Sequence, residues 1–285
     1  MRNILLAGFL LSFQWAAAQD KPAYQIFTKE GKPVDYGRMI KELGKSEVIL
    51  FGELHDNSID HWLELQVTKD LYTLNNSLAL GMEMFEADDQ IVLDEYLNGT
   101  IEEKHLLVEA KVWDNYKNDY KPLIEFAKEK KLKAIATNIP RRYANLVFRK
   151  GVESLNSLPD EAKQWIAPLP VEIDLALPGY KNMVAMAAHG QNMNGENMAR
   201  SQAMKDATMA YFILKNRAGV FIHFNGSYHS QNYEGISWYL KKAEPKLKIA
   251  TIHTVEQESI EKLEMDHAGS ADFIICIPKD MNKTY

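Results

Sequence analysis

Residues 48–57 read VILFGELHDN, an unbroken apolar run followed by a glycine and a group of polar residues. A short apolar run rich in β-branched and aromatic residues is typical of a strand buried on both faces of a parallel sheet. Glu53 and His55 follow two residues apart, so their side chains point to the same side if the backbone stays extended. This stretch therefore predicts an interior strand that ends in a pair of chemically active side chains.

The rest of the chain repeats this alternation between short apolar runs and longer amphipathic stretches, which is typical of strands joined by helices. The predicted strands are 48–53, 78–85, 132–137, 220–225, 248–253 and 272–277. Four helices are predicted. The first has Asn57 or Ser58 as its N-cap, the next two span 88–97 and 120–131, and the fourth begins near Pro140 and ends at Gly151. We expect an α/β fold with a central, mostly parallel sheet flanked by helices.

The segment 151–197 departs from this pattern, since it has weak periodicity and several prolines. It predicts an irregular helical excursion over one end of the sheet, where a lid would lie. No internal repeat or low-complexity linker interrupts the sequence. We therefore expect residues 19–285 to form a single domain.

The composition is that of an ordinary globular protein, with 46% apolar and 25% charged residues in a chain of 285. The formal net charge is −6, and no basic run is present that could neutralise a phosphate backbone. Nucleic acid is therefore not an expected partner. The single cysteine, Cys276, lies in the apolar run 273–277, which excludes an internal disulfide and predicts a buried thiol.

Residues 1–18 have the pattern of a secretory signal peptide: Arg2, an apolar stretch over 4–13, and three alanines at 16–18. The apolar stretch is short for a bilayer and polar sequence follows it, so a membrane anchor is the weaker alternative. No cysteine lies near the cleavage site to carry a lipid. We expect an exported protein, periplasmic or secreted, that is not a lipoprotein.

Polar residues also mark the ends of the other predicted strands. Glu83 lies near the end of the second strand, Arg141 follows the third at the start of a helix, and His229 follows the fourth. In an open parallel sheet, ligands bind beyond the carboxyl ends of the strands. We therefore predict that Glu53, His55, Glu83, Arg141 and His229 line one pocket.

Each of these residues also has a structural interpretation. A lone histidine after a strand, such as His55, is more often a loop or cap residue than a ligand. A carboxylate in an apolar strand is rarely left unpaired, so Arg141 could serve only as the salt-bridge partner of Glu83. His223 alternates with the apolar residues of its strand and is expected to be a hydrogen-bonded core histidine.

Five ordered blocks of the sequence resemble the ChaN-like haem-binding uptake proteins. The blocks are GELHDN at 52–57, EMF at 83–85, NIPR at 138–141, SQAMKDATMA at 201–210 and NGSYH at 225–229. The two Gly-x-x-His motifs, which end at His55 and His229, are similar to those of the wider superfamily of Tiki metalloproteases, TraB proteins and erythromycin-esterase-like hydrolases. The chain departs from the family after His229, where SQNY stands in place of basic residues.

The resemblance implies an exported α/β protein that binds haem in bacterial iron uptake, forms a homodimer in some members, and delivers its ligand to a membrane haem or iron transporter. Because the family holds haem iron through tyrosine, Tyr228, Tyr233 and Tyr180 are the candidate iron ligands, with His229 as the alternative. His55 and Glu83 would complete the haem pocket. Arg141, at a helix start, would suit a haem propionate.

Two functions of different class fit these residues. The first is haem binding and delivery, which needs no turnover. The second is hydrolysis of an ester or peptide bond, in which Glu53, His55, Glu83 and His229 hold a divalent metal such as Zn or Mn or act as acid and base. No Gly-x-Ser-x-Gly motif is present, which argues against a serine hydrolase of the α/β type. We therefore favour haem binding.

Overall fold

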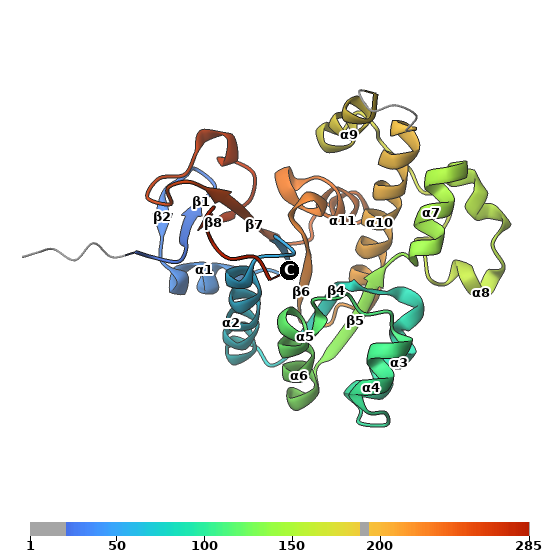
Figure 1. The fold of residues 1–285 in the computed structure, drawn as a ribbon, viewed down its shortest axis with the longest axis horizontal. Coiled ribbons are helices and arrows are strands. Elements are labelled where there is room, and N and C mark those ends of the chain that lie inside the picture. The colour runs from blue at the N-terminus through green and yellow to red at the C-terminus, as the bar shows by residue number, and fades with distance from the viewer. Residues whose placement is uncertain (1–20, 189–193, 285) are drawn as a thin grey trace, which may run out of the picture.

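The computed structural model describes residues 21–188 and 194–284, so the signal peptide predicted over 1–18 lies outside the described residues. An eight-stranded sheet runs through the molecule in the order β2-β1-β8-β7-β3-β6-β4-β5 (Figure 1). The strands are β1 Gln25–Thr28, β2 Pro33–Val34, β3 Val48–Glu53, β4 Leu78–Glu86, β5 Lys133–Asn138, β6 Val220–Gly226, β7 Ile249–Gln257 and β8 Phe273–Pro278. All pairs from β8 to β5 are parallel, whereas β1 is antiparallel to β8 and to β2. The predicted α/β fold with a mostly parallel sheet is confirmed.

The six predicted strands are all present, and the main difference is that β7 continues to Gln257. The sequence did not predict β1 and β2, which have four and two residues. Neither segment has an apolar run long enough to indicate a strand. They form because β1 pairs with the apolar strand β8, which extends the sheet at its edge.

The helices occupy most of the segments between the strands. The α-helices are α1 Tyr36–Leu43, α2 Ser58–Leu74, α3 Gln90–Leu97, α4 Glu103–Glu109, α5 Tyr116–Asp119, α6 Lys121–Lys130, α7 Arg141–Lys150, α8 Asp160–Lys163, α9 Pro178–Ala188, α10 Gly195–Asn216 and α11 Ile236–Ala243. The 3-10 helices are η1 Ala87–Asp89, η2 Val152–Ser157, η3 Ser227–His229, η4 Gln231–Tyr233 and η5 Met265–His267.

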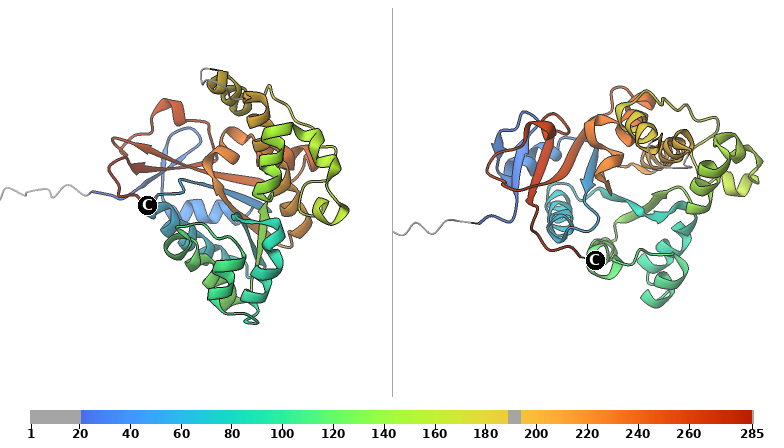
Figure 2. Two further views of the ribbon diagram at one scale, coloured as in Figure 1. Left: turned by 45° about the vertical axis from the view of Figure 1, so that its right-hand side comes forward. Right: turned by 45° about the horizontal axis from the view of Figure 1, so that its top comes forward.

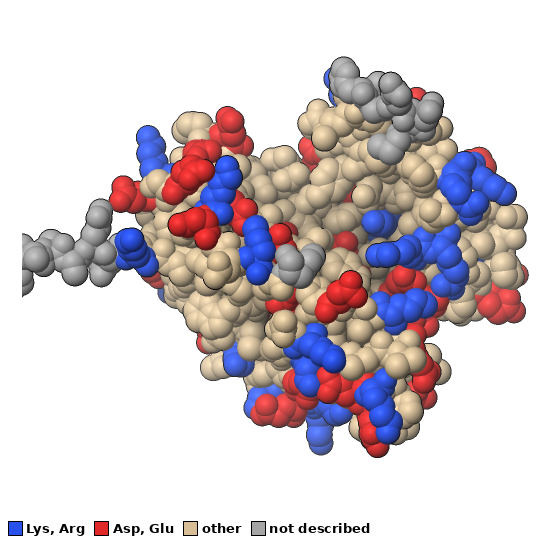
Figure 3. Space-filling view, in the orientation of Figure 1, with Lys and Arg blue, Asp and Glu red and all other residues tan. Residues whose placement is uncertain are grey.

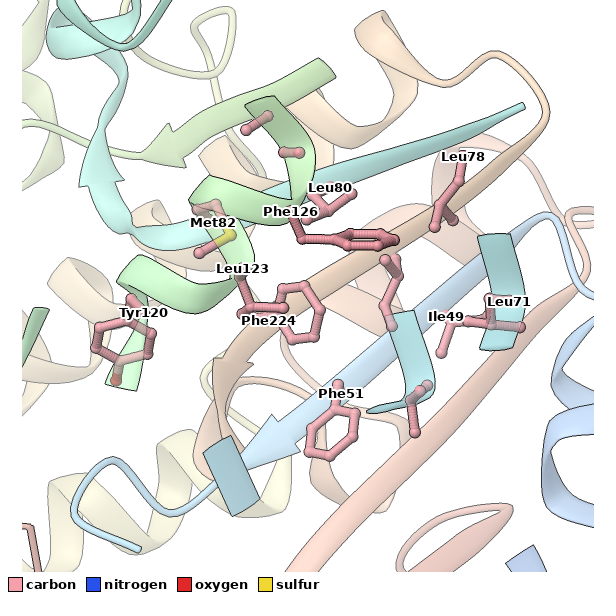
Figure 4. Close-up of a cluster of buried hydrophobic side chains, with 14 of the residues drawn as sticks. Ile49, Phe51, Leu71, Leu78, Leu80, Met82, Tyr120, Leu123, Phe126 and Phe224 are labelled. Carbon is pink, nitrogen blue, oxygen red and sulfur yellow. The ribbon is translucent and has the colours of Figure 1, made fainter. Parts of the chain in front are cut away.

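Helices cover both faces of the sheet, because the side chains of each central strand alternate between the faces. Ile49 and Phe51 of β3 face α1, α2 and α6, where they join the cluster shown in Figure 4. Val48 and Leu50 face α10 and α11 on the opposite side. Figure 2 shows this three-layer arrangement from two further directions. The central strands are thus covered on both faces, which leaves their ends to form a site.

Two helix starts place residues that matter for the site. The side chain of Asn57 accepts hydrogen bonds from the backbone amides of Ile59 and Asp60, which fixes the start of α2 directly after the first motif, as predicted. Pro140 is the residue before α7, and Gly151 ends that helix with a φ of 81°. Arg141 is consequently the first residue of α7 and projects from the edge where β5 ends.

The excursion predicted over 151–197 contains η2, α8, an extended irregular stretch and α9 before α10 begins. Residues from η2 and the irregular stretch pack with Val147 of α7 and Met204 of α10. Tyr180 of α9 packs against Ala199 and Ala203 of α10. The segment therefore packs against α7 and α10, beside the carboxyl ends of the strands (Figure 1).

Two predictions about buried residues are confirmed. Cys276 is fully buried in β8. His223 is fully buried in β6 and exchanges hydrogen bonds with Thr137 and Asn225.

Within the described part of the chain, no helix combines the length and the apolar character that crossing a membrane requires.

Candidate functional site

A pocket of about 560 Å³ opens at the carboxyl ends of the central strands, and we call it the strand-end pocket. It is lined from β3, β4, β5 and β6 by His55, Glu83, Asn138 and Gly226, and from above by residues of α7, α9 and α10. Figure 3 shows the molecule hollowed on this face, with Lys and Arg side chains gathered on one side of the hollow. The volume lies within the usual range of small-molecule and cofactor sites, roughly 300–1,000 Å³.

The first histidine of the pocket is held by the carboxylate of its own strand. The Nδ1 atom of His55 lies 2.6 Å from Oε1 of Glu53, and the hydroxyl of Tyr120 donates to the same oxygen at 2.6 Å. The ring of His55 packs edge-on against Trp113, with 4.9 Å between centroids. Burial by itself lowers the pKa of His55, but the Glu53 carboxylate outweighs this and raises it. The side chain is 34% exposed and lines the pocket.

Two glycines let the motifs come together. A Cβ atom on Gly226 would lie 2.7 Å from Nε2 of His55, and one on Gly52 would lie 2.9 Å from the carbonyl oxygen of Ile252. The backbone amide of Gly226 also donates to Oε2 of Glu83 at 2.8 Å. Glycine in each Gly-x-x-His motif is therefore required by close approach of neighbouring groups rather than by a positive φ.

The second histidine is buried between two carboxylates. The Nδ1 atom of His229 lies 2.6 Å from Oδ1 of Asp206, and its Nε2 atom lies 3.3 Å from Oε1 of Glu83. Burial opposes the charge on His229, but these carboxylates raise its pKa to about 10. In turn His229 holds the pKa of Glu83 well below its ordinary value in spite of burial. This group is therefore an imidazolium in a fixed ion pair at neutral pH.

Asp206 is a site residue that the sequence analysis did not assign, although it lies in the block at 201–210. It is fully buried on α10, and its second oxygen accepts a hydrogen bond from the hydroxyl of Tyr180 at 2.6 Å. The sequence could have indicated this role, because Asp206 lies on the apolar face of a helix with Ala203, Ala207 and Ala210. Such a group is rarely buried without a partner.

Two cations reach the strand-end pocket. Arg141 lines it from the first turn of α7, and Lys205 lines it from α10. The sequence analysis considered Arg141 as a salt-bridge partner of Glu83, but this interpretation is wrong, because Glu83 is paired with His229 and with the amide of Gly226. Arg141 therefore lines the pocket without pairing with Glu83. Lys205 was not predicted.

The three candidate tyrosines have different positions. Tyr228 lines the strand-end pocket, and its hydroxyl is buried without a hydrogen-bond partner among the described residues. The hydroxyl of Tyr180 is committed to Asp206. Tyr233 lies outside the pocket, where its hydroxyl donates to Asp272 and its ring contacts Lys29. Positive φ angles at Asn232 and Tyr233 reverse the chain after the second motif, which corrects the grouping of Tyr233 with Tyr228.

The structure thus brings His55, Glu83, Arg141 and His229 to one pocket, as predicted. The prediction that Glu53 also lines it is wrong, because its side chain is fully buried behind His55. Its walls also carry apolar side chains, from Trp113, Phe148 and Met183 among others. A pocket with apolar walls, two cations and one unpaired phenol suits a flat, apolar ligand that carries negative groups. Two histidines oriented by carboxylates also suit acid–base chemistry or metal binding.

Comparisons with known proteins agree with this architecture. The family model for "Haem-binding uptake, Tiki superfamily, ChaN" matches residues 39–240. No curated protein matches the sequence significantly.

Among solved structures, the fold is similar to ChaN of Campylobacter jejuni, described with cofacial haem binding, with a TM-score of 0.65, 19% identity, and coverage of 88% of this chain and 96% of the other. It is also similar to the erythromycin esterase EreC, with a TM-score of 0.51, 11% identity, and coverage of 89% and 97%. A succinoglycan biosynthesis protein gives a TM-score of 0.52 at 9% identity, with coverage of 86% and 91%. Since the family model covers most of the chain, including both Gly-x-x-His motifs, this protein belongs to the ChaN family of haem-binding uptake proteins in the Tiki superfamily.

Proposed function

We propose that the protein binds haem in the strand-end pocket and serves in iron uptake without chemical turnover. The observation that carries this proposal is that Tyr228, whose buried hydroxyl has no hydrogen-bond partner among the described residues, lines a pocket that Arg141 and Lys205 also line. A buried hydroxyl without a partner costs about 1–3 kcal/mol, so a group that binds it relieves that cost. Ferric haem iron is such a group, since tyrosine is one of its known axial ligands.

The other residues of the pocket fit the rest of a haem. Arg141 and Lys205 would pair with the two propionates, and Arg141 does so from a helix start, where free backbone amides also favour an anion. Trp113, Phe148 and Met183 offer apolar contact to the ring. His55 and Glu83 lie on the strand side of the same pocket.

The protein itself keeps Tyr228 neutral when no metal is bound. Burial raises the pKa of its phenol, and the negative charges of Asp206 and Glu234 raise it further. Ionisation of the phenol therefore requires a strong Lewis acid, and ferric iron supplies that when it is bound. Of the alternatives, Tyr180 and His229 are both committed to Asp206, which leaves Tyr228 as the favoured ligand.

Hydrolysis is the second candidate function, and one observation favours it. Two histidine–carboxylate pairs, His55 with Glu53 and His229 with Asp206, lie at one pocket, and Glu83 lies beside them. This set could hold a divalent metal or move a proton to and from a substrate. His229, however, is enclosed by two carboxylates that keep it protonated, so only His55 is suited to act as a base.

We further propose that the protein is exported through residues 1–18, that it acts in the periplasm or outside the cell, and that it passes haem to a membrane transporter. The sequence pattern of these residues and the membership of the family support this proposal. Homodimer formation, with a second copy closing the open side of the pocket, belongs to the same proposal.

Titration of the purified, haem-free chain with ferric haem separates the two functions. We expect a saturable change in the haem spectrum with about one haem per pocket, and no turnover of model ester or peptide substrates before or after addition of Zn²⁺ or Mn²⁺. Metal-dependent hydrolysis without a haem spectrum would instead support the second candidate. A matched control is Tyr233→Phe, which removes a hydroxyl outside the pocket and is expected to leave the titration unchanged.

A further inference from the structure

A second group of polar side chains lies behind the strand-end pocket, between β3 and α2. The functions discussed above use Glu53 of this group but not its other members. The group consists of Glu53, His61 and Glu64, which are fully buried or nearly so. One ligand atom from each residue lies within 4.8 Å of the others. The Nδ1 atom of His61 is 3.1 Å from Oε2 of Glu64 and 3.9 Å from Oε2 of Glu53. We call this group the inner cluster.

Local structure explains why these residues meet. His61 and Glu64 are three residues apart, so they lie on one face of α2, the face that packs on the sheet. Glu53 is the last residue of β3, directly before the turn into α2. The Asn57 cap fixes where α2 begins and therefore how its first turns face Glu53.

The hydrogen bonds of His61 orient its Nδ1 atom toward the inner cluster. Its Nε2 atom lies 3.0 Å from the backbone carbonyl oxygen of His55, which can only accept a hydrogen bond, so Nε2 donates to it. The Nδ1 atom shares a hydrogen bond with Oε2 of Glu64 at 3.1 Å. Metal-bound histidines have this arrangement, in which the second nitrogen donates to a carbonyl or carboxylate.

The carboxylates of the inner cluster are not satisfied within the protein. Oε2 of Glu53 and Oε1 of Glu64 are buried and have no hydrogen-bond partner among the described residues. Both side chains are 0% exposed. In the described part of the chain, their only ion-pair partners are His55 and His61. Two carboxylates, each with one unpartnered oxygen among the described residues, thus meet beside an imidazole in a buried site, and such a group needs a shared proton or a cation.

We propose that the inner cluster binds a divalent transition-metal ion of the Zn²⁺ or Mn²⁺ type through Glu53, His61 and Glu64. Two carboxylates and one neutral imidazole balance the double charge of such an ion, and mixed oxygen and nitrogen ligands suit both metals. The ion would use Oε2 of Glu53, since Oε1 already accepts hydrogen bonds from His55 and Tyr120. Glu53 would therefore join the ion to the first histidine of the strand-end pocket.

Two further acidic side chains lie near the inner cluster, and both have other partners. Asp119 accepts a hydrogen bond from Asn115 and also lies 3.6 Å from Nε2 of His61. Asp60 accepts a hydrogen bond from Thr254.

The test is a metal count on the full chain without haem. The protein is stripped with a chelator, incubated with Zn²⁺, freed of unbound ion and analysed by elemental mass spectrometry, and the count is repeated with Mn²⁺. We expect about one tightly held ion per chain and a rise in the thermal midpoint, because a ligand that binds only the folded state stabilises it. A wild-type protein that retains neither ion would overturn the proposal and leave a proton shared by the two carboxylates.

Two variants separate the inner cluster from the strand-end pocket. Glu64→Gln keeps the size of the side chain but cannot ligate as an anion, and we expect the tightly held ion to be lost from the metal count. His229→Ala changes the strand-end pocket and its buried ion pair but no residue of the inner cluster, and we expect the ion to be retained. Loss of the ion in His229→Ala with retention in Glu64→Gln would place the metal in the pocket and contradict the proposal.

Two further measurements guard against a variant that fails to fold and against confusion with haem binding. If Glu64→Gln does not fold, His61→Gln and the wild-type metal count decide the matter. Haem titration of Glu64→Gln distinguishes this proposal from the proposed function, since an unchanged haem spectrum with no metal uptake is the expected outcome.

Discussion

The two Gly-x-x-His motifs have the same pattern and lie on neighbouring strands, yet their histidines have different environments. His55 contacts one carboxylate, that of Glu53, and 34% of its side chain is exposed. His229 lies between Glu83 and Asp206, and only 7% of its side chain is exposed. The first ring can therefore meet a ligand, whereas the second is fixed as a buried cation that holds β4, β6 and α10 together.

The difference arises from the elements that surround each motif. The carboxylate beside His55 comes from its own strand, whereas the partners of His229 come from β4 and from α10. The glycine of each motif allows neighbouring groups to approach the backbone closely. The four-residue motif does not, however, determine whether its histidine is charged. Variants that act on one motif and spare the other test this distinction.

The largest effect is expected from Asp206→Ala. It removes one carboxylate from the buried pair with His229 and also leaves the hydroxyl of Tyr180 without its acceptor. Breaking a buried ion pair by removing one partner costs about 3–5 kcal/mol in the free energy of unfolding. Denaturant unfolding measures the loss. Asp206→Asn, which can still accept a hydrogen bond, should lose less, and equal stability of Asp206→Ala and wild type would show that His229 is not held in this way.

Acid should destabilise the protein through a histidine that is buried without a carboxylate. Burial lowers the pKa of His223 to about 4, against about 6.5 in an unfolded chain. The folded pKa is the lower one, so the stabilisation is present above pH about 6.5 and is lost as the pH falls toward 4, on the order of 3 kcal/mol in total. Denaturant unfolding across this range measures it.

The control for that measurement is His223→Gln, which cannot titrate. This variant should lose less stability than the wild type between neutral pH and pH about 4, whatever its stability at neutral pH. His253 is another buried histidine with a lowered pKa, and it should account for part of the pH dependence of stability that remains in this variant. An identical pH dependence in His223→Gln and wild type would contradict the assignment.

Arg141→Ala should weaken haem binding by about 1.5–3 kcal/mol, the scale of one hydrogen bond to a charged group. The side chain is exposed at the start of α7, so the variant should fold normally. Haem titration gives the affinity, and Arg149→Ala at the other end of the same helix is the matched control. Equal affinities for the two variants would assign Arg141 no role in the pocket.

The smallest effect is expected from Gly226→Ala. The added methyl group would lie 2.7 Å from Nε2 of His55, so the ring must move, at a cost of about 1–3 kcal/mol in stability. Gly37→Ala is the control, since its Cβ atom would meet nothing closer than 3.6 Å. Thermal unfolding compares the two. An unchanged thermal midpoint in Gly226→Ala would mean that the ring of His55 can move aside without cost, which would contradict the close contact.

Much of the fold was predictable because the interior strands are buried on both faces and therefore form continuous apolar runs. The edge strands β1 and β2 were not, since β1 depends on pairing with β8 rather than on a pattern of its own. For the pocket, the crossover rule correctly placed the strand-end residues together. It could not assign Asp206 or Lys205, because a helix that crosses the strand ends has no fixed relation to them in sequence.

Tyr233 and the inner cluster mark two further limits. Closeness in sequence suggested that Tyr228 and Tyr233 share a site, but the left-handed backbone at Asn232 and Tyr233 turns the chain away. His61 and Glu64 are three residues apart and therefore lie on one face of a helix. Solvent-exposed pairs on helices have the same spacing, so the sequence does not show that these two are buried. Only the position of α2 against Glu53 makes them a buried group.

The central claim is that Tyr228 offers haem iron its ligand, and the absorption spectrum of the ferric haem complex tests it most directly. We expect the wild-type complex to show a tyrosinate-to-iron charge-transfer band, Tyr228→Phe to lose it, and Tyr180→Phe and Tyr233→Phe to keep it. Retention of the wild-type spectrum in Tyr228→Phe would contradict the account.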